Sequence, residues 1–245
     1  NIWHVYPTGG VSVLVQRLAE GLEDAIRLES PVEGILVDGG RVVAVQVAGR
    51  VEECSAAIST APCNVLPKLL RGSRALDHLG EFRFRPMVFV NLRLQGQGLL
   101  PDTVLWTPES QFPFFRVTET TRSMPWLAPP GKSLITVDFG CEKSDPVWSM
   151  PDQELTEFCL DHLTPIIRDA RKAFMGAQVL RTPIAYPVYL NHYEPSRRRF
   201  RESTGIEGLY SIGRNGEFAH ILMEDVYWRT LAKVRQVHRD LEAAA

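Results

Sequence analysis

The last part of the chain carries residues suited to binding an anion. An apolar run at residues 208–212 leads into Gly213-Arg214-Asn215-Gly216, and a helical pattern follows. A strand, a glycine turn and a helix in this order aim backbone N–H groups at an anion such as a phosphate. The arginine adds a planar fork of donors that is always charged. Many α/β proteins contain such turns without a ligand, so other motifs must decide whether this one binds a phosphate.

Other kinds of site find no such support. No Ser, His and Asp residues have the spacing of a hydrolase triad, and no cluster suggests a metal site. Cys54, Cys63, Cys141 and Cys159 lie far apart with no C-x-x-C spacing. We therefore expect four free thiols in a reducing compartment and no zinc. The 17 prolines, 5 tryptophans and 6 tyrosines form several short clusters, which suit the wall of a pocket.

The composition is that of a soluble globular protein. The 245 residues are 44% hydrophobic and 23% charged, with 27 Lys and Arg against 29 Asp and Glu. A formal net charge of −2 argues against a nucleic-acid-binding protein, which usually carries a basic surplus. No apolar run approaches the roughly 18–20 residues that cross a bilayer, and residues 1–4 lack the features of a signal peptide. We expect a cytoplasmic protein and, because the first residue is not Met, a fragment or a trimmed chain.

The first part of the chain predicts a helix followed by short strands. Apolar residues at helical spacing predict the helix over residues 11–23. Asp38-Gly39-Gly40 lies between two alternating apolar runs, which predicts a hairpin with a tight turn. Ala61-Pro62 stops a small apolar run of the kind found in buried strands that end at a ligand cleft. The strands expected here cover residues 26–28, 32–37, 41–47, 51–54 and 56–60.

The middle of the chain predicts an antiparallel sheet with a covering helix. Longer apolar runs alternate with loops rich in proline and glycine. Asp152 suits the N-cap of a helix with one apolar face, which Pro165 is expected to kink or end. Residues 195–202 are expected to form a solvated basic loop or the start of a helix. The strands expected here cover residues 86–94, 103–107, 114–119, 133–139 and 179–189.

Three segments together resemble one protein family. Residues 3–10 read WHVYPTGG before the predicted helix, residues 32–45 are followed by ISTAP at 58–62, and GRNGEF at 213–218 precedes Met223-Glu224. Their order and spacing resemble the flavin-dependent amine oxidase superfamily. This family includes protoporphyrinogen oxidase-like proteins, carotenoid-type desaturases and UDP-galactopyranose mutases. AYPVY at residues 185–189 is similar to the branch that holds the first and last of these.

Two departures from the family pattern matter. The family begins with a βαβ unit whose G-x-G-x-x-G turn holds the pyrophosphate of the cofactor, and this sequence contains no such motif. The half that would grip the ADP end of the flavin is therefore expected to be missing. The last motif is also altered, with His220, Leu222 and Glu224 where the branch commonly has Tyr, Asn and Asp.

The resemblance implies FAD as the cofactor and assigns contacts to it. The Gly-Arg turn would lie beside the pyrophosphate, and the strand that begins at residue 32 would meet the adenine through its backbone. The start of the last helix would face the pyrimidine edge of the ring, where a helix dipole favours negative charge. The same residues would otherwise be a structural arginine, plain strand residues and an ordinary helix start. The implied cofactor-binding residues are Val32, Thr60, Ala61, Pro62, Gly213, Arg214, Met223 and Glu224.

The resemblance also places aromatic and polar-tipped residues around the flavin ring. Tyr and Trp bring a hydrogen-bonding handle to an otherwise apolar wall, and a histidine can exchange a proton near neutral pH. Each such residue is individually more often part of a core or a rim, and no catalytic residue stands out. The implied substrate-binding residues are His4, Tyr6, Trp106, Arg116, Tyr186 and Tyr189, and no metal is expected.

Together these observations predict an α/β (α+β) protein with two lobes that are discontinuous in sequence. Residues 1–62 and 205–245 would form a partial FAD-binding lobe of the glutathione-reductase-like type. Residues 63–204 would form a substrate-binding lobe built on an antiparallel sheet with helices. Strands left without neighbours would expose a sheet edge, which invites self-association or a partner that supplies the missing dinucleotide-binding half.

Three functions follow, in order of preference. The first is an FAD-dependent oxidoreductase of the amine oxidase or protoporphyrinogen oxidase type, or a fragment of one, that acts on a small molecule. The second is a mutase-like reaction in which reduced flavin attacks a nucleotide sugar without net redox, with Arg116, Tyr186 and Tyr189 as donors to its pyrophosphate. The third is a truncated, non-catalytic relative that acts as a binding module.

Overall fold

The structure, a computed structural model, describes residues 5–244 and divides into two compact units. Of the described residues, unit 1 contains 5–26 and 85–185, and unit 2 contains 27–84 and 186–244. Both units contain helices and strands, so the mixed α/β class is confirmed.

The units divide the chain at other points than the expected lobes. Residues 63–84 belong to unit 2, although the sequence places them in the substrate-binding lobe. Two long-range hydrogen bonds tie this segment to the unit. The amide of Cys63 donates to the carbonyl oxygen of Asn215 (3.1 Å), and the hydroxyl of Tyr193 donates to that of Glu81 (2.5 Å). Such bonds join distant residues and leave no local sequence signature.

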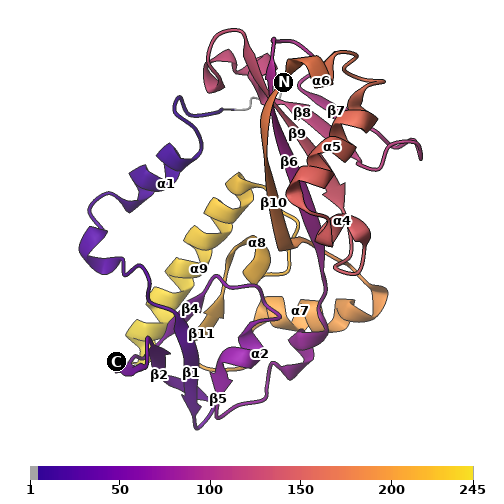
Figure 1. Cartoon of the computed structure of the whole chain (residues 1–245). Helices are drawn as coiled ribbons and strands as arrows, with labels where there is room; N and C mark the ends of the chain where they lie inside the picture. The colour runs from indigo at the N-terminus through magenta and orange to yellow at the C-terminus, as the bar shows by residue number, and fades with distance from the viewer. Residues whose placement is uncertain (1–4, 245) are drawn as a thin grey trace. The chain divides into compact units, whose positions relative to one another are not determined.

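Unit 1 is built on a five-stranded sheet in the order β10-β6-β9-β8-β7 (Figure 1). The pairings β6–β9, β8–β9 and β7–β8 are antiparallel, which confirms the sheet expected in the middle of the chain. The strands are β6 (Phe84–Gln95), β7 (Val104–Trp106), β8 (Arg116–Glu119), β9 (Lys132–Gly140) and β10 (Phe174–Pro187).

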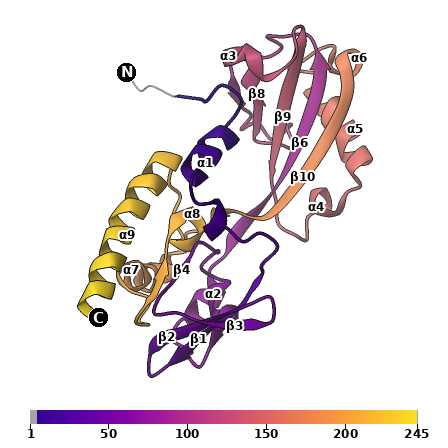
Figure 2. The same ribbon diagram turned by 90° about the vertical axis from the view of Figure 1, so that its left-hand side faces the viewer.

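Helices cover one face of this sheet, and α4, α5 and α6 lie along the same side of it in Figure 2. Alternate strand residues such as Val88, Val137 and Phe139 point into the core, where they meet Leu155 and Cys159 of the longest of these helices. That helix ends two residues before Pro165, as the sequence predicts. The helices are α3 (Thr120–Ser123), α4 (Pro146–Ser149), α5 (Asp152–Leu163) and α6 (Ala170–Ala173), with a 3₁₀ turn at Pro125–Leu127.

The first described segment of unit 1 departs from its prediction. Helix α1 (Ser12–Ala19) is shorter than expected and buries no residue, and a 3₁₀ turn (Glu23–Ala25) follows it. The strand predicted at residues 26–28 is wrong, because these residues form no strand and Leu28 is 82% exposed. An apolar run becomes a strand only where a neighbouring strand receives its hydrogen bonds.

Unit 2 contains a four-stranded sheet in the order β3-β2-β1-β5. The predicted hairpin, between β1 and β2, is confirmed, since Asp38 pairs with Arg41 across a two-residue turn. Both turn residues have positive φ, +56° at Gly39 and +82° at Gly40, which glycine adopts without steric cost. The strands are β1 (Val32–Asp38), β2 (Arg41–Val47), β3 (Arg50–Glu53) and β5 (Leu70–Arg71).

A second sheet in unit 2 has two parallel strands, β4 (Ala57–Ser59) and β11 (Leu209–Ser211). Around it lie four helices. They are α2 (Leu66–Leu69), α7 (Glu194–Glu202), α8 (Gly213–Gly216) and the long α9 (Met223–Ala244), and 3₁₀ turns occur at Asp77–Glu81 and Asn191–Tyr193. Within residues 5–244, no helix combines the length and the apolar character needed to cross a membrane.

Candidate functional site

The parallel strands β4 and β11 bring two of the predicted cofactor-binding segments together. Residues 60–62 follow β4 and residues 213–214 follow β11, so both segments leave the sheet at its carboxyl edge. The amide of Ile212 donates to the carbonyl oxygen of Ser59 (3.0 Å), which locks the two strand ends side by side. The carboxyl edge of parallel strands is where α/β proteins commonly bind ligands.

Beyond β11, Gly213 has a φ of +84° and open space where a Cβ would lie. Its amide donates to a carboxylate oxygen of Glu217 (3.3 Å), and Arg229 donates to the other oxygen of that carboxylate (2.9 Å). The turn therefore holds an anion, but the anion comes from the protein itself. Sequence reasoning missed Glu217, whose only signal was an acidic residue one helical turn after the glycine.

The side chain of Arg214 is occupied within unit 2. Its Nη1 donates to the carbonyl oxygen of Ile221 (2.8 Å), and its guanidinium lies 5.2 Å from the centre of the Tyr186 ring. The ring of Tyr186 in turn meets the ring of His220 edge-on at 5.2 Å. Arg214 thus ties together the end of β10 and the segment that leads to α9.

A cavity of about 240 Å³ lies between β4 and the four-stranded sheet. Three of the predicted cofactor-binding residues line it, namely Val32, Thr60 and Ala61. The other lining residues are Ile35, Val45, Ala57, Ile58, Ser59 and Leu69, which make the wall mostly apolar. Because ligand pockets usually measure roughly 300–1,000 Å³, this cavity has room for one ring system of a larger ligand.

The start of α9 presents the last predicted cofactor-binding residues. Met223 is 59% exposed and Glu224 is exposed as well. A carboxylate oxygen of Asp225 accepts the amide of Leu222 (3.0 Å) just before the helix. The first-turn amides of a helix have no intrahelical acceptor, so α9 offers donors at this end.

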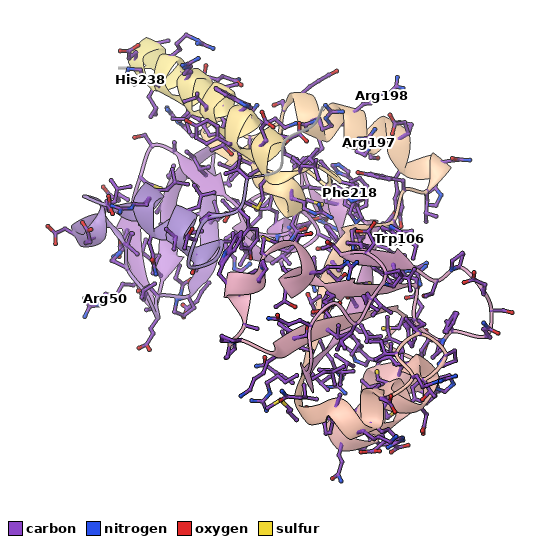
Figure 3. The ribbon with its side chains drawn as sticks, turned by 90° about the horizontal axis from the view of Figure 1, so that it is seen from above. Arg50, Trp106, Arg197, Arg198, Phe218 and His238 are labelled. Atoms are coloured by element: carbon purple, nitrogen blue, oxygen red, sulfur yellow. The ribbon has the colours of Figure 1, made fainter. Side chains whose placement is uncertain are left out.

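Tyr189 is predicted to bind substrate, and its hydroxyl is used on the backbone. It accepts the amide of His220 (2.7 Å) and donates to the carbonyl oxygen of Phe218 (3.4 Å). The guanidinium of Arg197 lies 5.4 Å from the centre of its ring. Figure 3 labels Arg197 on α7 and Phe218, which is fully buried.

In unit 1, Trp106 and Arg116 lie opposite each other on β7 and β8, on the sheet face away from α5. The guanidinium of Arg116 is 5.4 Å from the centre of the Trp106 ring, and its Nε donates to a carboxylate oxygen of Asp138 (2.7 Å). Asp138 is 1% exposed, and burial raises its pKa while Arg116 opposes the rise. In the sequence, Asp138 is visible as a charged residue within the apolar run of β9, which could have indicated a buried partner for an arginine.

The remaining predicted residues lie apart from these groups. Tyr6 is 38% exposed in the coil before α1, and His4 lies outside the described residues. All four cysteines are free thiols, and burial raises the pKa of Cys63 and of Cys159 to about 12, so neither is a nucleophile at neutral pH. Among residues 5–244, no three His, Cys, Asp or Glu side chains gather closely enough to hold a metal ion.

A second, larger cavity of about 630 Å³ lies along the outer side of β11, between α7 and α9. Charged side chains of both signs line it, including Arg201, Glu207, Lys233 and Asp240. The strand edge beside it is partly capped, because the hydroxyl of Thr204 donates to the carbonyl oxygen of Leu209 (2.8 Å) and the amide of Leu209 donates to Ile206 (3.2 Å).

Comparison with known proteins gives one family and a consistent fold. A family model described as flavin containing amine oxidoreductase matches residues 3–227. Reduced UDP-galactopyranose mutase is similar with a TM-score of 0.71 at 18% identity, over 86% of this chain and 47% of that chain. A candidate protoporphyrinogen oxidase from Exiguobacterium sp. 255-15 has a TM-score of 0.68 at 21% identity, over 84% of this chain and 46% of that chain. Wild-type putrescine oxidase bound to putrescine has a TM-score of 0.70 at 16% identity, over 93% of this chain and 53% of that chain.

These identities are low enough that the likeness concerns the fold. The chain spans about half the length of the solved structures that it matches.

Proposed function

The chain belongs to the flavin-containing amine oxidoreductases, and we propose that it forms part of an FAD-dependent oxidoreductase acting on a small molecule. The chemistry supplied by bound FAD is acceptance of a hydride from a C–N or C–C bond, with later transfer of two electrons to an acceptor. The residues of this chain bind and orient the cofactor and the substrate. The four free thiols suit a reducing compartment, so we place the protein in the cytoplasm.

The observation that carries the proposal is the meeting of β4 and β11 beside an apolar cavity. Val32, Thr60 and Ala61 line that cavity, which suits the flat, apolar faces of the adenine ring. Pro62 and Gly213 continue from the ends of the two strands, where the cofactor backbone would pass. Gly213 leaves room for a closely approaching phosphate because its Cβ position is open, and such a phosphate would take the place of the Glu217 carboxylate on its amide. Met223 and Glu224 offer the first amides of α9 to the edge of the flavin ring.

The residues predicted to bind a substrate pyrophosphate favour the oxidoreductase over a mutase that acts on a nucleotide sugar. A pyrophosphate carries at least two negative charges and needs donors that are free to meet it. Of the residues predicted to bind the substrate's pyrophosphate, Arg116 is paired with a buried carboxylate and the Tyr189 hydroxyl is bonded to the backbone. Turnover that needs reduced flavin yet consumes no oxidant would instead favour the mutase.

We further propose that a segment outside these 245 residues completes the cofactor site. The parallel pair β4–β11 has three residues in each strand, and parallel strands are usually found in larger, covered sheets. The cavity beside β11 gives such a segment a place to lie. Because the edge of β11 is capped at Leu209, strand pairing there is limited both for such a segment and for β11 of another chain.

The test compares FAD with FMN, which lacks the adenosine half. We expect the chain to bind FAD weakly, in the range of roughly 10 μM or above, and about fivefold more tightly than FMN. Val32→Trp fills the adenine cavity and should remove that difference. Val51→Trp is the matched control, because Val51 is an exposed valine of the same sheet that does not line the cavity.

The titration is followed by quenching of flavin fluorescence. Equal affinity for FAD and FMN in the wild-type chain would contradict the adenine assignment. Binding of neither flavin would leave the non-catalytic binding module as the better function. A purified chain that already carries tightly bound yellow flavin would contradict the need for another segment.

A further inference from the structure

The segment between α8 and α9, residues 217–222, contains a strained residue. Phe218 has a φ of +50°, in the left-handed region that is unfavourable for a residue with a side chain. It follows Glu217, the C-cap of α8, and the amide of Ala219 returns to the carbonyl oxygen of Arg214 (2.9 Å). Glycine is the usual residue at such a helix end, so something must hold the phenylalanine there.

The ring of Phe218 supplies part of that hold. It is fully buried, with ring centres of Phe82 at 4.6 Å and Phe84 at 5.1 Å. The free energy gained by burying a phenylalanine ring is comparable to this backbone strain and offsets it. The ring fixes one residue of the segment, but it does not fix the residues after it.

Two tyrosine–arginine pairs fix those residues. Tyr189, with Arg197 over its ring, binds the backbone at both Phe218 and His220. Arg214, stacked on Tyr186, binds the carbonyl oxygen of Ile221. The segment is therefore held at three successive points, and α9 begins two residues after the last of them.

We propose that Tyr189 and Arg214 are positioning residues, which hold segment 217–222 in one conformation and thereby set the start of α9 against the flavin ring. This inference rests on the proposed function for the identity of the ligand. It assigns Tyr189 and Arg214 to the cofactor side of the site and removes them from direct contact with substrate and with phosphate. Strained residues persist where their surroundings over-determine them, and they gather at functional sites.

We call the contacts of Tyr189 and Arg214 with segment 217–222 the clamp. The first experiment removes only the hydroxyl of Tyr189, with Tyr189→Phe. Tyr193→Phe is the matched control, because the Tyr193 hydroxyl also donates to a backbone carbonyl and its ring also packs near Phe218, at 6.3 Å, but it makes no bond to segment 217–222. Tyr189→Phe loses two hydrogen bonds, one of them long, and Tyr193→Phe loses one, so both variants should show a small loss of global stability.

Two readouts separate positioning from stability. In Tyr189→Phe, amide hydrogen exchange at residues 218–224 should be about tenfold faster, and the affinity for FMN should fall about fivefold. Tyr193→Phe should leave both unchanged. Unchanged exchange in Tyr189→Phe would overturn the clamp, and faster exchange with unchanged FMN affinity would overturn its link to the flavin. If the wild-type chain binds neither flavin, the proposed function fails, while the exchange data still decide the clamp.

Arg214→Lys separates the clamp from direct phosphate binding. A lysine can still donate one hydrogen bond to Ile221, but it lacks the fork that grips a phosphate with two. We expect FMN affinity within about twofold of the wild type. A loss of tenfold or more would make Arg214 a direct phosphate ligand and overturn its positioning role.

Discussion

Unit 1 buries two carboxylates in its sheet, whereas Thr204 is the buried polar residue found in the described part of unit 2. Asp138 and Glu119 lie on opposite faces of the unit 1 sheet, one paired with an arginine and the other with backbone amides. In unit 2 the comparable hydrogen bonds run to backbone carbonyl oxygens, from the hydroxyl of Thr204 and from the guanidinium of Arg214. The buried polar acceptors in unit 1 are therefore carboxylates, whereas those in unit 2 are neutral carbonyl oxygens.

This difference has an energetic consequence. Removing one partner of a buried ion pair leaves a charge without compensation, which costs several kcal/mol, while removing one neutral hydrogen bond costs about 1 kcal/mol. Substitutions at the polar positions of unit 1 should therefore be the more damaging.

The largest effect is expected for Arg116→Ala. The carboxylate of Asp138 would be buried without its partner, so the free energy of unfolding should fall by about 3 kcal/mol. Urea unfolding measures the loss. Arg171→Ala is the control, because Arg171 is paired with two carboxylates that lie at the surface. An equal, small loss in both variants would erase the contrast between the units. Replacing both Arg116 and Asp138 by leucine should recover most of the stability.

The next effect is expected for Glu119→Gln. Glu119 is fully buried and accepts the amides of Gly98 (2.8 Å) and Leu100 (2.8 Å) and the hydroxyl of Ser133 (2.6 Å). A glutamine turns one acceptor oxygen into a donor and faces it with another donor, which should cost about 2 kcal/mol. Glu109→Gln, at an exposed position, is the control for thermal unfolding. Full stability in Glu119→Gln would show that the charge is dispensable.

A smaller effect is expected for Thr204→Val in unit 2. The Thr204 hydroxyl donates to the carbonyl oxygens of Ile206 (3.1 Å) and Leu209 (2.8 Å), and valine keeps its shape. The loss should be about 1 kcal/mol, because the partners are neutral. Chemical unfolding of unit 2, followed by the fluorescence of Trp228, measures it. A loss as large as that of Arg116→Ala would contradict the comparison.

The smallest effect is an opposite response of the two units to acid. In unit 2, hydrogen bonds from Arg27 lower the pKa of Glu52, and those from Arg198 and Arg197 lower that of Glu194, below the ordinary value of 4.5. The stability that these bonds provide is present above pH 4.5 and is lost as the pH falls below it. Both groups are at the surface, so the loss should be small.

Asp138 in unit 1 responds in the other direction. Burial raises its folded-state pKa above 3.8, so the native unit binds the proton more readily than the unfolded chain. Unit 1 should gain stability as the pH falls through the range just above 3.8. Fluorine NMR of 5-fluorotryptophan can follow Trp106 and Trp148 in unit 1 and Trp228 in unit 2 separately. Parallel titration of both units would contradict this prediction.

Local patterns in the sequence predicted the elements whose signals are local. The hairpin at Asp38-Gly39-Gly40 needs two residues that tolerate positive φ, and that requirement is visible in the residue types. The strands and helix of unit 1 alternate or repeat with the expected periods, so their positions were predicted to within a few residues. The strand predicted at residues 26–28 did not form, because its apolar composition suits a strand but no neighbouring strand pairs with it.

The contacts of the candidate site depend on pairings that no local pattern contains. The partner of Arg116 is fixed by the register of β8 against β9, which places Asp138 directly opposite it. Arg214 turns to a carbonyl seven residues later because Phe218 reverses the chain between them. Residue types could therefore nominate both arginines, but only the folded backbone decides what each one binds.

The pairing of β4 with β11 also determines the order in which the molecule can form. The two strands lie about 150 residues apart in the chain, and the core of unit 1 is formed by residues between them. During synthesis that core can fold as soon as its own residues leave the ribosome, whereas β4 must wait until β11 has been synthesised. Until then its apolar residues, Ile58 among them, have no neighbouring strand. Unit 2 is completed last, so the nascent chain is most exposed to aggregation and to chaperones at the strand that borders the candidate cofactor site.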